Sequence, residues 1–489
     1  MTSVRFLNFG GLLNTGVSDF LLQNNELTAM KNVWMYKIGL LEKVPGYEKA
    51  EATQVVSGED VDYLHYYYDT ANKVDYLLGV ADSGVNLTIK YRTTGAWSAL
   101  SGISTNLNDM AGANVSMQNY LGRTFVVGYK LSSNIFITNA TINGTAYAVS
   151  DSTNLTNMPQ GKFVVEYRDL LYVLYAKTGG TPYPSRAYYS DDPVNGAITW
   201  NNLTTKFIEF GQDDGDEITG AVEALDRLVV FKRFSMWKYD ESMRYKVAEI
   251  GCDSYRSIAI VGNVLYWFNR HGFYRWAGGQ PELISSKANE YIDAIDATKL
   301  DEVVASVYYE GEYRAFIGNI TLGDDTYNNA WFCWDTKKEQ CYIRCTYHDI
   351  KSTCRYVEGG KRRMYFGDDN GYVYKFADKI DEVYSDDGND IDSFFITKFL
   401  DHGVPEQTKF TNHITVFSNN CGGIKAAVAV DGHDNFVEAS IPILEKNIES
   451  RDFAGSGNRY KYKFYERGQS KSWQFEGIVV ETEISEHEE

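Results

Sequence analysis

The segment Ser257–Ser285 constrains the fold more than any other part of the sequence. It reads SIAIVGNVLYWFNRHGFYRWAGGQPELIS, and turn residues at Gly262-Asn263, Arg270–Gly272 and Gly278-Gly279 separate its short apolar and aromatic runs. Glycine and asparagine tolerate the positive φ angles of tight turns, so four short antiparallel strands are expected here. A four-stranded meander of this size is typical of one β-propeller blade, and a lone blade cannot bury both of its faces.

The rest of the chain supplies the neighbours that such a blade needs. Comparable groups of short strands start near residues 63, 113, 161, 219, 303 and 352. Their spacing of about 45 residues fits the period of propeller blades. We therefore predict an all-β fold with a β-propeller of about seven blades, with six or eight also possible. The last group has three strands, and its fourth is expected from the N-terminal part. A set of packed β-sandwiches is the alternative.

Changes of pattern divide the chain into three expected regions. Residues 1–54 form an N-terminal arm with a short helix over Asn24–Lys31 and a hairpin over residues 33–44. Residues 55–384 form the β-propeller, interrupted by an inter-blade helix within 287–301. Residues 385–489 form a C-terminal β-sandwich with an acidic tail, because the strands beyond SDDGNDID are longer and differently spaced.

The charge of the chain restricts its partners. Its 489 residues contain 66 acidic and 47 basic side chains, which gives a formal net charge of −19. Such acidity argues against tight binding to nucleic-acid phosphates and to anionic lipid surfaces. No run of residues approaches the roughly 18 apolar residues of a membrane span, and the first residues lack the apolar run of a signal peptide. We expect a protein without a membrane span.

Motifs for catalysis do not stand out in the sequence. The seven histidines lie at positions 65, 271, 348, 402, 413, 433 and 487. They form no HExxH motif, and neither GxSxG, a P-loop nor GxGxxG before a helix occurs. We predict no catalytic, cofactor-binding or metal-binding residue, no cofactor, and a protein that is not an enzyme. A carboxylate pair for sugar cleavage stays open, because acidic residues are many and nothing selects a pair.

Two weaker patterns leave metal binding as an alternative. Cys333, Cys341, Cys345 and Cys354 have the spacing C-x7-C-x3-C-x8-C, which matches no zinc module, so free thiols are expected of all six cysteines. Asp-rich turns are also candidates for calcium, although none matches the DxDxDG loop and turns favour Asp, Asn and Gly in any case. These turns cover residues 211–217, 323–325, 368–370 and 385–392.

Aromatic side chains stand on both faces of several expected strands. The runs are Tyr66–Tyr68, Tyr188-Tyr189, Tyr308-Tyr309 and Trp331–Trp334. Packing between blades needs large residues on both faces of a strand, and this is the expected role. Contact with neighbouring subunits is the alternative, because tyrosine and tryptophan are favoured at protein interfaces.

Two stretches of the sequence resemble propeller proteins of phage tails. The run Asn8–Asn14 (NFGGLLN), followed by Asn32-Val33 and by Gly39–Tyr47 (GLLEKVPGY), is similar to their opening segment. The segment Ser254–Trp276 looks like their central blade. In the expected sandwich, Lys409, the strand His413–Phe417 and Val430-Asp431-Gly432 are similar too. The family is that of the nozzle (tail tubular or tail hub) proteins of short-tailed phages.

This resemblance implies a virion structural protein that forms part of a ring or tube. Proteins of that family assemble as a hexameric tube below the portal and adaptor and conduct DNA into the host. The implied partners are further copies of this chain, the portal or adaptor, other tail proteins, and DNA that passes without specific binding. The implied location is the virion tail, after synthesis in the host cytoplasm. A receptor- or glycan-binding propeller at the tail tip is the first alternative, and a propeller glycoside hydrolase or lyase is the second.

Overall fold

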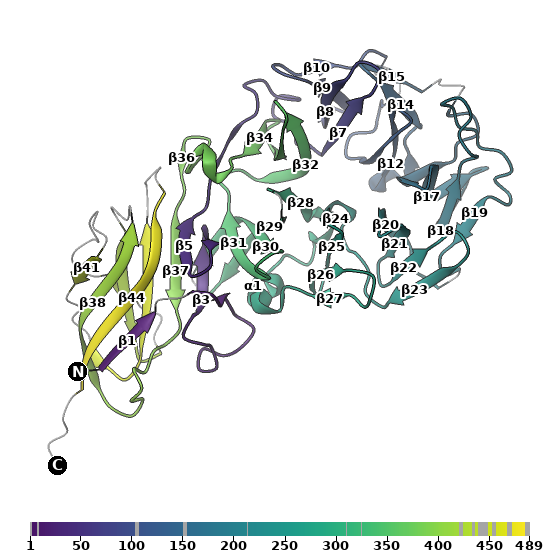
Figure 1. The fold of residues 1–489 in the computed structure, drawn as a ribbon. Helices are drawn as coiled ribbons and strands as arrows, with labels where there is room; N and C mark the ends of the chain where they lie inside the picture. The colour runs from purple at the N-terminus through teal and green to yellow at the C-terminus, as the bar shows by residue number, and fades with distance from the viewer. Residues whose placement is uncertain are drawn as a thin grey trace.

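The chain folds into a seven-bladed β-propeller joined to a β-sandwich, as a computed structural model shows (Figure 1). The structure describes residues 2–6, 9–102, 107–149, 154–212, 214–309, 311–323, 325–419, 424–432, 436–438, 448–451, 456–466 and 472–484. Within these ranges α1 (Asn289–Asp293) is the one α-helix, and strands carry nearly all other regular structure. The predicted all-β class, a propeller followed by a sandwich, is confirmed.

The first three blades are antiparallel meanders whose strands pair mostly in chain order. Blade 1 contains β7 (Tyr63–Asp69), β8 (Val74–Ser83), β9 (Asn86–Arg92) and β10 (Ser98–Ala99). Blade 2 contains β11 (Asn114–Tyr120), β12 (Arg123–Lys130), β14 (Ala140–Asn143) and β15 (Ala146–Ala148), with β13 (Ile135–Phe136) paired to β12. Blade 3 contains β16 (Gln160–Tyr167), β17 (Leu170–Thr178), β18 (Thr181–Tyr189) and β19 (Phe207–Glu209).

The next three blades repeat this arrangement. Blade 4 contains β20 (Ile218–Ala224), β21 (Arg227–Lys232), β22 (Met236–Tyr239) and β23 (Arg244–Ala248). Blade 5 corresponds to the segment Ser257–Ser285. It contains β24 (Ala259–Val261), β25 (Val264–Asn269), β26 (Gly272–Trp276) and β27 (Glu282–Leu283). Blade 6 contains β28 (Val304–Tyr308), β29 (Glu312–Leu322), β30 (Asp325–Asp335) and β31 (Gln340–Cys345). The predicted inter-blade helix is shortened to α1, between blades 5 and 6.

A strand from the N-terminal part completes blade 7. The blade contains β32 (Ile350–Glu358), β33 (Lys361–Asp368) and β34 (Val373–Phe376), and β6 (Tyr47–Lys49) pairs antiparallel to β34. Two short strands, β35 (Ser385–Asp386) and β36 (Asn389–Asp390), extend the same sheet. The predicted closing strand is thus found, and it ties residues more than 300 positions apart into one ladder.

The sandwich is built from both ends of the chain. One sheet has the order β4 (Val33–Lys37), β5 (Leu40–Lys43), β44 (Gln474–Ile484), β38 (Lys409–Asn419) and β41 (Ile448–Arg451), with β1 (Thr2–Phe6) on β44 and β42 (Ser456–Gly457) on β38. The other has the order β2 (Leu12–Leu13), β3 (Glu26–Lys31), β37 (Ser393–Thr397), β43 (Tyr460–Glu466), β39 (Lys425–Val430) and β40 (Val437–Glu438). Phe9, Phe395 and Phe475 meet between the two sheets.

This pairing differs from the expected division at residues 54 and 384. The first five strands belong to the sandwich, β6 belongs to blade 7, and β35 and β36 extend blade 7 rather than the sandwich. The predicted helix over Asn24–Lys31 is wrong, because that segment is β3 and pairs antiparallel with β37. A helix of eight residues is marginal by itself. The strand instead buries Leu27 and Met30 completely against the sandwich core.

A buried polar network joins the sandwich to the propeller. Asn32 has a left-handed backbone (φ 57°), and its Oδ1 accepts hydrogen bonds from the Cys345 amide at 2.7 Å and from Arg344 Nη1 at 2.9 Å. Its Nδ2 donates to the Asp392 carbonyl at 2.7 Å. Arg344 is fully buried and pairs with Asp386. Because a buried charge left unpaired costs several kcal/mol, these contacts fix the sandwich beside blades 6 and 7 (Figure 1).

Candidate functional site

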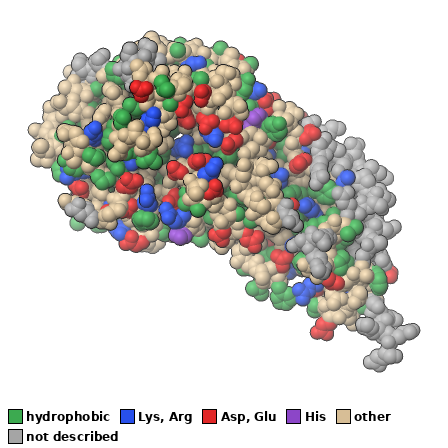
Figure 2. Space-filling model, turned by 180° about the vertical axis from the view of Figure 1, so that it is seen from behind, with side chains coloured by type: hydrophobic (Ala, Val, Ile, Leu, Met, Phe, Trp, Pro, Cys, Tyr) green, Lys and Arg blue, Asp and Glu red, His purple; other side chains and the backbone are tan. Residues whose placement is uncertain are grey.

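The first strand of each blade lines the axis of the propeller. The segments that lead into these strands bring charged and aromatic side chains to one end of the axis. There they line a cavity of about 310 Å³ that includes Lys162, Glu217, Asp253, Tyr255 and Asp301. A second cavity, of about 330 Å³, lies along the inner strands and is lined by Glu166 and Glu223 among others. Figure 2 shows acidic and basic side chains interspersed over the middle of one propeller face.

Tyr255 closes the axis between these two cavities. Its hydroxyl donates a hydrogen bond to the Val115 carbonyl of blade 2 at 3.0 Å, and its ring meets Phe163 of blade 3 with centroids 5.2 Å apart. Tyr255 and Phe163 line both cavities. Gly220 of blade 4 leaves room for them, because a Cβ there would lie 3.1 Å from the Tyr255 Cβ. The axis of a single propeller is therefore blocked by side chains between the two cavities.

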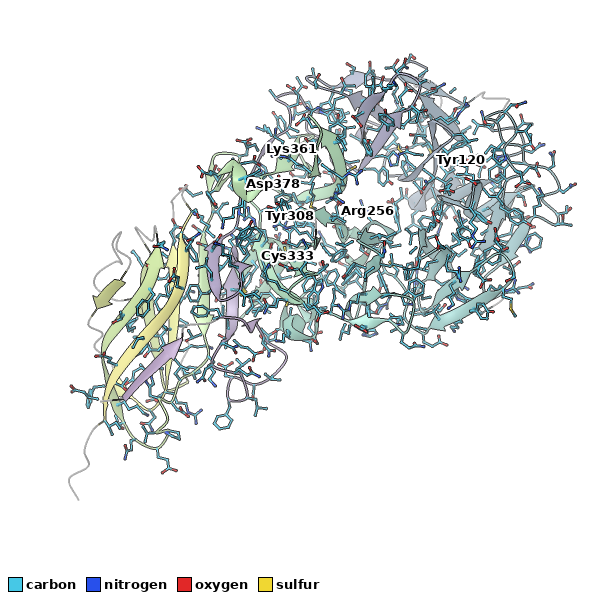
Figure 3. All side chains as sticks on the ribbon, viewed as in Figure 1. Tyr120, Arg256, Tyr308, Cys333, Lys361 and Asp378 are labelled. Carbon is cyan, nitrogen blue, oxygen red and sulfur yellow. The ribbon has the colours of Figure 1, made fainter. Side chains whose placement is uncertain are left out.

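Arg256 connects blade 5 to blades 1, 6 and 7. Its guanidinium donates to the carbonyls of Asp62, Lys351 and Asp301, at 3.4, 3.1 and 3.3 Å, which lie at the starts of blades 1, 7 and 6. Figure 3 shows Arg256 beside the axis. Ser254 adds a hydrogen bond of 2.6 Å to the Val303 carbonyl. The short turn of blade 5 over residues 254–256 thus contacts every other blade, and we call it the axial hub.

The carboxyl of Asp62, which lies beside the axial hub, has a raised pKa. Burial raises its pKa to about 7, and the carboxylates of Asp82 and Asp60 act in the same direction. Arg256 and Lys351 oppose this rise. The Oδ2 atom of Asp62 is buried and has no hydrogen-bond partner among the described residues.

The imidazole of His65, on the inner strand of blade 1, has a lowered pKa, in contrast to the raised pKa of Asp62. Burial lowers the pKa of its imidazole to about 4, and its Nε2 lies 2.9 Å from Asn119 Oδ1. The ring is therefore neutral at pH 7 and serves as a hydrogen-bonding group of the interior.

A larger pocket of about 710 Å³ lies between blades 3 and 4. Tyr175, Tyr183 and Phe234 contribute aromatic rings to its wall. Glu217 and Arg233 line both this pocket and the axial cavity, so the two hollows share a wall. We call the larger hollow the inter-blade pocket.

A lysine occupies the centre of the acidic turn 211–217, one of the calcium candidates. The Lys232 ammonium is buried, donates to Ser185 Oγ at 3.1 Å and to the Phe210 and Gly211 carbonyls at 3.0 and 3.3 Å, and pairs with Asp214 at 2.5 Å. These oxygens surround a cation that the chain itself provides. Asp213 of this turn and Asp324 of another lie outside the described residues.

The described residues of the other acidic turns and the described cysteines show no metal geometry. Asp368 accepts hydrogen bonds from the Asn370 and Tyr372 amides, as in an ordinary turn. Cys341 and Cys345 are buried, and burial raises the pKa of each thiol to about 12. Within the described ranges no group of three or more His, Cys, Asp or Glu residues is placed to hold a metal. Cys421 lies outside those ranges.

Most of the predicted aromatic runs pack inside the protein. Tyr67, Tyr188 and Trp331 are almost completely buried, whereas Tyr68 and Tyr309 remain 40% and 49% exposed. Sequence reasoning singled out Ser254–Trp276 but missed the role of Tyr255 and Arg256, because their partners lie up to 194 residues away.

The residues of the phage-tail resemblance have structural roles. Asn32 joins the two parts of the molecule, and a Cβ at Gly46 would lie 1.9 Å from the Ser385 carbonyl oxygen. The buried Tyr47 hydroxyl accepts hydrogen bonds from the Tyr347 and His348 amides. Asn8 lies outside the described residues.

No protein-family model matches the sequence, and no curated protein matches it. Among solved structures, the extracellular domain of a putative one-component system from B. thetaiotaomicron matches with TM-score 0.41 and 9% identity, over 81% of this chain and 48% of that chain. An exo-β-1,3-galactanase from Phanerochaete chrysosporium matches with TM-score 0.27 and 10% identity, over 90% of this chain and 100% of that one. The chain thus spans about half the length of the one-component-system domain.

These comparisons correct one prediction. We expected a protein that is not an enzyme, and that exclusion does not stand, because the matching structures include a galactanase. At this identity and TM-score, the likeness assigns no activity to this chain. None of the helices in the described ranges has the length and apolar character to traverse a bilayer.

Proposed function

We propose that this chain is a structural subunit of a phage tail nozzle or hub, assembled as a closed ring around a DNA path. The observation that carries the proposal is a set of exposed apolar side chains in the N-terminal part of the chain, between and beside the motifs that resemble the tail proteins. Phe20, Leu21 and Ile38 are 73%, 69% and 79% exposed. Adjacent exposed apolar side chains, as at Phe20 and Leu21, are typical of a surface that another subunit covers.

The blocked axis supports a ring of several copies. DNA does not fit through a propeller whose axis contains Tyr255, so a conduit has to lie between subunits. A closed ring needs heterologous contacts, in which one face of each subunit binds a different face of the next subunit. The net charge of −19 on each copy lets DNA pass without tight binding.

Light scattering and negative-stain imaging of the purified chain, alone and mixed with portal and adaptor proteins, test this proposal. We expect closed rings, with six copies as the number implied by the resemblance. The double variant Phe20→Ser with Leu21→Ser is expected to weaken assembly at least about tenfold, because it removes apolar area from the interface.

The matched control is Ile380→Ser, since Ile380 is 72% exposed on the propeller and lies outside the N-terminal part of the chain. This control should assemble like the wild type. A chain that stays monomeric in every mixture, or a double variant that assembles normally, would contradict the proposal.

A further inference from the structure

We propose that the inter-blade pocket binds a neutral oligosaccharide. The argument uses the pocket alone and does not depend on whether the chain assembles into rings. The pocket lies between blades 3 and 4, and strands or tight turns supply all of its walls. Its volume of about 710 Å³ is within the range of sites that enclose small ligands.

Aromatic rings give the pocket the flat apolar surfaces that sugar rings stack on. Phe234, at the turn between β21 and β22, is 53% exposed. Tyr183 on β18 carries the Arg186 guanidinium 4.0 Å from its ring centroid, which fixes both groups. Tyr175 lies at a bulge of β17 with a left-handed backbone (φ 49°) and carries the Lys162 ammonium at 3.5 Å. Tyr183 and Tyr175 are thus held in place before a ligand arrives, each by a cation on one face of its ring.

The charged groups of the pocket are already paired with one another. Glu209 binds Arg186 at 2.7 Å, and Glu217 lies 3.6 Å from Arg233. Asp214 pairs with Lys232, as described above. The remaining carboxylate, Asp216, accepts hydrogen bonds from the Arg233 and Phe234 amides at 3.0 and 3.1 Å.

This pairing excludes most classes of ligand. The pocket offers no unpaired positive group for a phosphate, and its acidic residues outnumber its basic ones, which disfavours nucleic acid and acidic sugars. The carboxylates are satisfied by internal donors, which disfavours a metal ion. The polar wall also disfavours a lipid chain. A neutral ligand with hydroxyl groups and a flat apolar face fits these conditions.

Two polar side chains in the wall remain available for such hydroxyl groups. The Gln212 amide and the Tyr183 hydroxyl make no side-chain hydrogen bond within the described part of the chain. An amide offers both donors and an acceptor, which matches a hydroxyl that donates and accepts. Gln212 lines the same pocket as the aromatic rings, and the Tyr183 hydroxyl belongs to one of those rings.

Titration calorimetry of the full chain against neutral gluco-, galacto- and manno-oligosaccharides of two to six units tests the proposal, with a sialylated and a sulfated oligosaccharide as acidic probes. We expect saturable binding of at least one neutral probe and no comparable binding of the acidic ones. The variants Phe234→Ala and Gln212→Ala are each expected to weaken binding, by about tenfold for the aromatic variant.

The matched control is Tyr245→Ala, because Tyr245 is 41% exposed in the same blade and does not line the pocket. It should bind like the wild type. Absence of binding across the neutral probes, equal binding by both pocket variants, or binding confined to the acidic probes would overturn the proposal. Ring assembly is unaffected by the pocket variants if both proposals hold, so the two can fail separately.

Discussion

The oxygens of the acidic turn 211–217 surround the ammonium group of Lys232. The turn composition alone is equally compatible with calcium binding and with an ordinary turn. The group that decides between these two roles is the Lys232 ammonium, which belongs to the next blade and lies 18 residues after Asp214 in the chain. A single buried side chain thus converts a candidate metal site into an internal ion pair. Variants of this lysine would leave the Asp214 carboxylate without its partner.

His65 gives a prediction for the pH dependence of stability. Its pKa of about 4 in the folded chain lies below the value of about 6.5 in an unfolded chain, so the unfolded state binds the proton first. Stability is therefore lost as the pH falls from about 6.5 towards 4. His65→Gln keeps a donor for Asn119 and removes this titration. Relative to the wild type, the variant should gain about 2 kcal/mol between pH 7 and pH 4.5.

Thermal melts of the two proteins at matched pH check this result. Asp62 titrates in the opposite sense, because its raised pKa makes stability fall as the pH rises through about 4 to 7. It is present in both proteins, so its contribution cancels in the comparison. Melting temperatures that stay parallel from pH 7 to pH 4.5 would refute the role given to His65.

At the scale of elements, the sequence allowed the blades to be predicted but not their connections at the axis. Period-two patterns and Gly/Asn turns set most strand positions, as in the strands around Gly262. The stretch Thr199–Asn202 has the local pattern of a final strand for blade 3, yet that strand, β19, lies at Phe207–Glu209. Trp200 is instead buried beside blade 2, where its indole nitrogen donates to the Asn154 carbonyl. Burial of one large side chain therefore overrode the local strand pattern.

The axial hub carries a second prediction. Tyr255→Ala removes a ring that contacts Phe163 and a hydrogen bond to Val115, and it joins the two axial cavities. We expect it to lower the free energy of unfolding by about 3–5 kcal/mol. Tyr255→Phe keeps the ring and should cost about 1–2 kcal/mol, because the Val115 carbonyl loses its partner. Urea denaturation measures both values, and equal stability of the three proteins would show that the hub is dispensable.

At the scale of the whole molecule, one hydrophobic core cluster joins the sandwich to blades 5, 6 and 7 of the propeller. Sequence patterns placed the sandwich after residue 385, and nothing local indicated that residues 2–43 supply five of its strands. Nothing in the segment Glu26–Lys31 indicates which strand it pairs with, because its partner residues lie 363 or more positions later in the chain. The pairing follows from burial and from edge hydrogen bonds that form only in the folded chain.

The network around Asn32 predicts that the two parts unfold together. Asn32→Gly keeps the left-handed backbone and removes the side chain, so Arg344 and the Cys345 amide lose an acceptor inside the protein. We expect a loss of about 2–4 kcal/mol and a broader or split calorimetric transition. The control is Asn195→Gly, an exposed left-handed residue (φ 53°), which should leave the transition unchanged. A single sharp transition at the wild-type temperature in Asn32→Gly would contradict the coupling.

The pairing of β1 with β44 and of β6 with β34 also determines when a newly made chain can fold. The ribosome releases β1 and β6 well before their sheet partners, because the residues of β34 that pair with β6 are synthesised only after residue 372 and those of β44 that pair with β1 only after residue 477. Until then the early strands have open edges, which chaperones or local collapse have to cover. A chain cut short during translation lacks the strands that complete both sheets, so unfinished copies are unable to compete with complete ones.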